Sequence, residues 1–243
     1  MVIKPMDKVP IYIQLEEHIR ELIDSESLHP GDRVPSEAEL ARAHGISRMT
    51  VRKALDRLEM DGVIVRRAGK GTFVAKPKIV HGASTVFSFS ANLSAVGYET
   101  RTQVAERRVT KPEPGIRSKL GLSPESSVVV IGRVRFIGDD PVALNWDYLP
   151  HPEFAEIMNM DVTHDSILKV ISDITGSKRL KADDELSISL ARPKEAELLG
   201  IRVGSPVFVV QGITYDDSGE PVKYTKAVYR GDRFLFVPAK NAD

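Results

Sequence analysis

The pattern of apolar positions predicts two amphipathic helices near the start of the chain. After Pro10, apolar residues at 12, 15, 19, 22 and 23 share one helical face, which predicts a helix of about fourteen residues. Further on, Val51, Ala54, Leu55 and Leu58 recur at i, i+3, i+4 and i+7. This second helix has a stripe that faces a core and a remainder that is polar and basic.

Capping residues place a short helix between these two. Ser36 and Glu39 form an S-x-x-E capping box, Gly45 suits the left-handed residue that closes a helix, and Ser47 can cap the next one. Two short helices joined by a turn of about three residues predict a helix-turn-helix.

The segment "VIVRRAGKGTFV" then predicts a β-hairpin whose tip, residues 67–71, is basic and rich in glycine. A nucleotide-phosphate loop is the competing interpretation of "GKG", but the spaced glycines and the Lys-Ser/Thr of a P-loop are missing. The hairpin therefore has the position and shape of a wing.

Beyond this hairpin, strand-like runs alternate with short helical ones, and a weak internal repeat predicts an antiparallel sheet with pseudo-two-fold symmetry. The Leu-Gly pairs at 120–121 and 199–200 start two similar stretches, each with a proline further on, at 141 and 221. We expect an α+β protein with a winged helix-turn-helix domain over 1–75, a linker over 76–84 and a second domain over 85–243.

Composition narrows the class of protein. The chain has no cysteine, no apolar run long enough for a membrane span and no signal-peptide pattern at its start, which favours a cytoplasmic protein. The histidines show no metal-ligand spacing, and the paired aspartates at 139–140, 183–184 and 216–217 are expected in turns. We find no catalytic arrangement, and we expect no cofactor, no metal and no enzymatic activity.

Charge is unevenly distributed. The net charge is zero, but residues 47–78 contain nine bases and three acids, so this segment carries +6 and the rest of the chain −6. Basic residues on a helix are commonly just solvated. Next to a helix-turn-helix and a wing they instead indicate a surface for DNA, on which Arg48 and Arg52 reach phosphates or guanines and Ser47 and Thr50 supply hydroxyls. Gly69 leaves room for the wing tip in a minor groove.

A second group of polar residues predicts an anion site in the C-terminal domain. Arg133 and Arg135 lie two apart and so project from one face of a strand, while Val128, Val130, Val134 and Phe136 should be core on the other face. Arg133 is expected opposite Asn145, and the internal repeat adds Lys223, Thr225 and Tyr229 to the same face. Surface arginines in weak salt bridges are the alternative. Three buried cations without a counter-ion would favour a small anion.

Ser88 and Ser90, in "SFSANL", can start a helix whose free amides bind an anion, or can simply cap that helix.

The segment "PSEAELARAHGISRMTVRKALDRLEMDGVIVRRAGKGTFV" resembles the winged helix of GntR-family bacterial transcription regulators. "AVYRGDRFLF" is similar to the close of the ligand-sensing UTRA domain of the HutC subfamily, whose fold is similar to chorismate lyase. The resemblance covers the whole chain and implies a homodimer that binds a palindromic double-stranded DNA operator, as a repressor released by a small anionic metabolite such as a sugar phosphate.

Two sets of residues carry over from the resemblance. The resemblance implies that the operator is contacted by Arg48, Thr50, Arg52 and Gly69, and that Ser47 and Lys70 lie beside these contacts. It also implies that the effector is contacted by Ser88, Ser90, Arg133, Arg135, Ser166 and Tyr229.

The chain departs from the family at a few of these positions. Ala38 replaces a common arginine, Leu168 stands where relatives that sense sugar phosphates have tyrosine, and Asn145 and Lys223 stand where they have glutamate. We therefore expect a more anionic or differently shaped effector. A chorismate-lyase-like enzyme with an accessory DNA-binding domain and a constitutive DNA-binding dimer are the alternatives. Turnover of a chorismate-like acid would indicate the enzyme. Indifference to metabolites would indicate the constitutive dimer.

Overall fold

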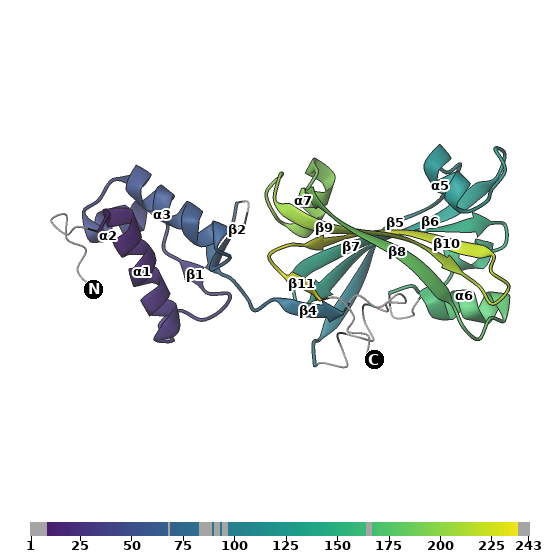
Figure 1. The fold of residues 1–243 in the computed structure, drawn as a ribbon, viewed down its shortest axis with the longest axis horizontal. Coiled ribbons are helices and arrows are strands. Elements are labelled where there is room, and N and C mark those ends of the chain that lie inside the picture. Colours follow the sequence, from purple (N-terminus) through teal and green to yellow (C-terminus); the bar gives the residue numbers. More distant parts are fainter. Residues whose placement is uncertain are drawn as a thin grey trace. The chain divides into compact units, whose positions relative to one another are not determined.

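The computed structural model describes residues 9–67, 69–82, 89, 93, 97–163 and 167–237. The chain divides into two compact units: the first comprises Met1–Ile79 together with Gly200–Arg202, and the second comprises Val80–Leu199 and Val203–Asp243 (Figure 1). Among the helices of the described residues, none is long and apolar enough to cross a membrane.

The first unit consists of three helices followed by a hairpin, as the apolar pattern predicts. Strands β2 and β3 pair antiparallel and form the wing, and the short strand β1 adds to the other side of β3. The elements are α1 (Ile11–Asp24), β1 (Arg33–Val34), α2 (Glu37–His44), α3 (Arg48–Met60), β2 (Ile64–Arg67) and β3 (Gly71–Val74).

The predicted caps explain where α2 and α3 begin and end. Ser36 accepts a hydrogen bond from the Glu39 amide while the Glu39 carboxylate accepts one from the Ser36 amide, so the capping box is complete. Gly45 has φ 64°, the left-handed conformation that closes α2, and Ser47 accepts from the Thr50 amide at the start of α3. The predicted stripe at Val51 and Leu55 lies in the core with Leu15.

The second unit is built on a six-stranded antiparallel sheet in the order β5-β6-β7-β10-β9-β8. A two-stranded sheet pairs β4 with β11. The strands are β4 (Ile79–Gly82), β5 (Thr100–Thr110), β6 (Ser127–Ile137), β7 (Asp140–His151), β8 (Lys181–Leu190), β9 (Pro206–Tyr215), β10 (Pro221–Arg230) and β11 (Phe234–Val237). The helices are α5 (Pro114–Lys119), η1 (Ala155–Met158), α6 (Ile167–Thr175) and α7 (Pro193–Leu199).

The strand order confirms the internal repeat. The run β5-α5-β6-β7 corresponds to β8-α7-β9-β10, and the two runs meet between β7 and β10 in the middle of the sheet. The repeated Leu-Gly pairs follow α5 and end α7, with Gly121 at φ 64° and Gly200 at φ 62°. The sheet therefore has the predicted pseudo-two-fold arrangement.

Both faces of β6 are buried, which differs in part from the expectation for this strand. Helices α5 and α7 lie on one side and α6 on the other (Figure 1). Val128 and Val130 pack with Leu120 on the first side, as predicted, but Val129 and Ile131, on the same face as the arginines, are also fully buried, against η1 and α6. Alternation alone could not reveal this, because a strand between two layers buries both of its faces.

A buried ion cluster joins the β6–β7 turn to the end of β10. Asp140 binds Arg230 at 2.8 Å and Arg233 at 3.2 Å, and all three side chains are nearly inaccessible to solvent. Asp140 is therefore not simply a turn residue, as expected for the 139–140 pair. Its neighbour Asp139 is exposed.

Removal of the Asp140 carboxylate should destabilise the second unit strongly. Asp140→Ala leaves two guanidinium groups buried without it, and we expect the free energy of unfolding to fall by about 3–5 kcal/mol. Asp139→Ala, one residue earlier and exposed, should change it by less than about 0.5 kcal/mol. Urea unfolding followed by circular dichroism measures both, and equal values for the two variants would contradict this role of Asp140.

Candidate functional site

The first candidate site is the exposed side of α3 together with the wing. Arg48 and Arg52 both lie on this exposed side. The hydroxyls of Ser47 and Thr50 lie 2.8 Å apart, and Ser47 also caps the helix, so both hydroxyls are fixed in place. At the wing, Gly69 has φ 68° and is exposed, like Lys70 beside it.

Arg52 is held by a partner that the sequence did not reveal. Its Nε donates to Glu37 Oε1 at 3.1 Å, and its Nη2 donates to Glu37 Oε2 at 2.8 Å. This hydrogen bonding lowers the pKa of Glu37. A bidentate pair fixes the direction of the guanidinium. Within the described residues, Arg48 has no such partner.

Some of the bases of segment 47–78 serve the fold instead. Arg66 binds Asp56 at 2.5 Å and Glu59 at 2.9 Å, and Arg57 binds the buried Glu16 at 2.6 Å. These pairs leave Arg48 and Lys70 among the bases that are free to meet a phosphate. Met49, beside Arg48, is 70% exposed, which the amphipathic pattern did not single out.

The second candidate site is a cluster of polar side chains on one face of the large sheet. Arg133 pairs with Asn145 across β6 and β7, as predicted, and Asp147 pairs with Thr225 across β7 and β10. Lys223 lies two residues before Thr225, on the same face. The cluster thus spans the line where the two halves of the repeat meet.

Asp147 is the centre of this cluster. Its Oδ2 accepts from Arg133 Nη2 at 2.8 Å, and its Oδ1 lies 2.8 Å from Thr225 Oγ1 and 3.4 Å from Lys223 Nζ. Burial alone would raise its pKa, but Lys223 and Arg133 lower the pKa to about 2. The expectation of three buried cations without a counter-ion was therefore wrong, because Asp147 supplies one.

Arg135 is in a different situation from Arg133. Its Nη1 donates to Thr102 at 2.6 Å and its guanidinium lies 5.3 Å from the centre of the Phe89 ring, but no carboxylate among the described residues forms a salt bridge with it. Burial and the nearby Arg133 lower the pKa of Arg135 to about 9. Three buried atoms of the cluster find no hydrogen-bond partner in the described part of the chain, namely Nε of Arg133, Nε of Arg135 and Oδ1 of Asn145.

Tyr229 closes one end of the cluster. Its ring packs edge-on against Phe234, with 5.0 Å between centroids, and burial raises the pKa of its hydroxyl. The Asn145 side chain is hydrogen-bonded to this hydroxyl. The structure thus brings together five predicted effector residues, which are Arg133, Arg135, Asn145, Lys223 and Tyr229.

Asp184 is an acid that the sequence analysis assigned to a turn, and that assignment was wrong. It lies within β8, and its side chain reaches over Gly212 of β9, where an added Cβ would lie 1.7 Å from Asp184 Oδ1. Partial burial raises its pKa, against the pull of Lys223. Only a glycine at 212 allows the carboxylate to lie there.

The remaining predicted effector residues, Ser88, Ser90 and Ser166, lie outside the residues that the structure describes.

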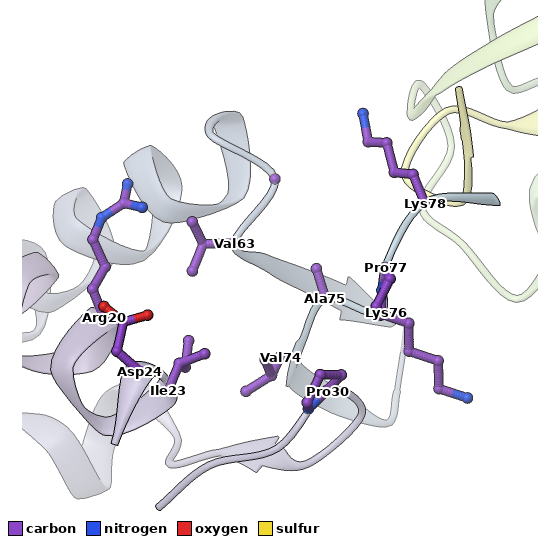
Figure 2. A pocket seen from close by; sticks show the side chains of 11 residues that line it. Arg20, Ile23, Asp24, Pro30, Val63, Val74, Ala75, Lys76, Pro77 and Lys78 are labelled. Atoms are coloured by element: carbon purple, nitrogen blue, oxygen red, sulfur yellow. The ribbon is translucent and has the colours of Figure 1, made fainter. Parts of the chain in front are cut away.

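A cavity of about 410 Å³ lies elsewhere, in the first unit, between the end of α1 and residues 74–78 (Figure 2). Its walls include Ile23, Val63 and Val74, and the side chains of Lys76 and Lys78 extend away from it (Figure 2). Arg20, at its edge, is bound to Asp61 at 2.5 Å. None of the predicted site residues lines this cavity.

Comparison with known proteins gives two family matches. Residues 11–74 match the bacterial regulatory proteins of the gntR family, and residues 95–235 match the UTRA domain.

Individual relatives match over almost the full length. The chain is 35% identical to the HTH-type transcriptional repressor NagR of Bacillus subtilis, over 98% of this chain and 97% of the relative. It is 26% identical to a probable fructoselysine utilization operon transcriptional repressor of Escherichia coli K12, over 93% of both chains. The crystal structure of PhnF from Mycobacterium smegmatis superposes with a TM-score of 0.65 at 25% identity, covering 94% of this chain and 99% of that one.

The low pKa of Asp147 predicts how stability depends on pH. A carboxyl whose pKa is lower in the folded state stabilises the fold above its unfolded value of 3.8, and this contribution is lost as the pH falls towards about 2. We expect the free energy of unfolding to decrease by about 2 kcal/mol more in the wild type than in Asp147→Asn between pH 5 and pH 2.

Urea unfolding at a series of pH values measures this difference. Asp173→Asn, which removes an exposed carboxylate paired with Lys169, serves as the matched control and should follow the wild type. Parallel pH curves for the wild type and Asp147→Asn would contradict the assignment.

Proposed function

Because the chain belongs to the GntR family of bacterial regulatory proteins and carries a UTRA domain, we propose that it is a repressor released from its operator by a small anionic metabolite. The observation that carries the proposal is the buried cationic cluster, in which Arg135 has no carboxylate partner among the described residues. A buried guanidinium of this kind gains most from an anionic ligand. The protein then acts in the cytoplasm and binds its ligand without transforming it.

We assign the operator contacts to α3 and the wing. Arg48 and Arg52 suit guanines or phosphates in a major groove, and Glu37 orients the second of them. Ser47, Thr50, Gly69 and Lys70 complete the proposed surface.

The effector site comprises the sheet cluster. Arg133, Arg135, Asn145, Lys223 and Tyr229 form its described part, and Ser88, Ser90 and Ser166 are proposed to complete it. Release requires that the ligand bind more tightly to a conformation with low operator affinity.

A homodimer is supported by the edge of the large sheet. Strand β8 is the last strand of the sheet, so one side of its backbone has no partner strand among the described residues. Leu186, Ile188 and Leu190, at alternate positions, are 48%, 75% and 62% exposed. Proteins usually protect such an edge, and an apolar row there suits a second copy of the chain. Two copies would hold two winged helices at a fixed spacing for a palindromic operator.

Arg48→Ala should weaken operator binding by about 1–3 kcal/mol, or roughly 5- to 150-fold, if Arg48 reads a base. The measurement is fluorescence anisotropy at fixed salt, on DNA that the wild type has enriched from a random pool. Lys169→Ala removes an exposed cation from the second unit and should bind as the wild type does.

Arg48 is not a contact if its variant binds within twofold of the wild type. The repressor function itself fails if the wild type selects no sequence, or if no small acid from a metabolite panel lowers its affinity for the selected DNA.

Ile188→Arg should convert a dimer into a monomer, because it places a charge in the apolar row of β8. Sedimentation velocity of the full chain at micromolar concentration measures the state. Ser189→Arg adds the same charge on the other face of β8 and should leave the dimer intact. A wild type that sediments as a monomer, or an Ile188→Arg variant that stays dimeric, would contradict this interface.

A further inference from the structure

The three cations of the sheet cluster differ in what already neutralises them. Asp147 uses one oxygen for Arg133 and the other for Lys223 and Thr225, so both of its oxygens are occupied. The Asp184 carboxylate, on the edge strand β8, also interacts with Lys223, so two carboxylates accompany the three cations. Arg133 has a further contact from Nη1 to the Val162 carbonyl at 3.4 Å, while its buried Nε has no hydrogen-bond partner among the described residues. A ligand anion placed between Arg133 and Lys223 would therefore have to lie next to the Asp147 carboxylate, and like charges repel.

Arg135 has no carboxylate in contact with it among the described residues. Its contact with Thr102 is to a neutral hydroxyl, and it is only 7% exposed, so water does not compensate its charge well. Its Nε is buried and has no hydrogen-bond partner among the described residues. An anion at this guanidinium finds one uncompensated positive charge and a free donor.

A neutral acceptor lies on the same face. Oδ1 of Asn145 is buried and has no hydrogen-bond donor in the part of the chain described. Arg135 and Asn145 lie on neighbouring strands, since Arg135 pairs with Ala143, two residues before Asn145 on β7. A ligand that satisfies both groups carries an anionic group and, close to it, a hydroxyl or an N–H.

We propose that Asp147 determines the charge of the effector: together with Asp184 it leaves one net positive charge in the cluster, at Arg135, which therefore receives a singly charged carboxylate and not a doubly charged phosphate or sulfate. The inference rests on the proposed function, because it specifies the ligand of the same site. Asp147 is a specificity residue here, and Arg135 is the ligand contact.

The test uses the full chain and simple anions as probes. Thermal unfolding is followed against lactate, a hydroxylated monocarboxylate, and against sulfate and inorganic phosphate, with chloride keeping the ionic strength constant. The wild type should be stabilised saturably by lactate, with a half-saturation concentration at least tenfold lower than for sulfate or phosphate. Arg135→Met should abolish the saturable response, whereas Lys169→Met, on the surface, should retain it.

Asp147→Asn should reverse the preference. It frees Arg133 and Lys223, so sulfate and phosphate should now half-saturate at a lower concentration than lactate, and at more than tenfold lower concentration than in the wild type. If this variant does not fold, as judged by circular dichroism, Asp147→Asn combined with Lys223→Met provides the second test. The double variant leaves one buried cation fewer, yet still frees Arg133 beside Arg135, so it should show the same reversal.

The outcomes separate the two proposals. Sulfate or phosphate that binds the wild type through Arg135 as tightly as lactate overturns this inference and leaves an anion-released repressor standing. A folded Asp147 variant that keeps the wild-type preference also overturns it. No saturable response of the wild type to any of the three anions counts against the proposed effector site itself.

Discussion

The Asp147 carboxylate, which is almost completely enclosed, holds the middle of the large sheet together. It connects Arg133 on β6, its own strand β7, and Lys223 and Thr225 on β10. Removing one partner of a buried pair typically costs about 3–5 kcal/mol, since the other charge remains buried. The cluster on this face exists because that one negative charge lets two cations stay inside the protein.

Much of the first unit could be predicted because its signals are local. The capping box of Ser36 and Glu39, the left-handed Gly45 and the cap at Ser47 each involve residues at most a few positions apart. The internal repeat gave the antiparallel sheet in the same way, since the Leu-Gly pairs and prolines mark equivalent points along the chain. The position of Asn145 opposite Arg133 could also be predicted, because the length of the turn between β6 and β7 determines which residues of the two strands pair.

The groups that sequence reasoning missed depend on distant parts of the chain. Asp147 and Thr225 meet only because β7 and β10 are neighbours, which no local pattern encodes. Glu37 orients Arg52 from another helix, and Asp184 lies over Gly212 because the strand opposite lacks a side chain there. The aspartate pairs at 139–140 and 183–184 looked like turns, because two adjacent acids are common in turns and their partners, such as Arg230, are far along the sequence.

The meeting of the two sheet halves between β7 and β10 also has a consequence for the order of folding. The β6–β7 and β9–β10 hairpins close short loops, whereas the pairing of Asp147 with Thr225 closes a loop of nearly eighty residues and depends on a strand that is synthesised that much later than β7. The helices and strands of the winged helix in the first unit all lie before residue 80 in the sequence. A growing chain therefore completes its winged helix well before Asp147 can meet Thr225, so under the proposed function the part that binds DNA forms before the part that binds the effector.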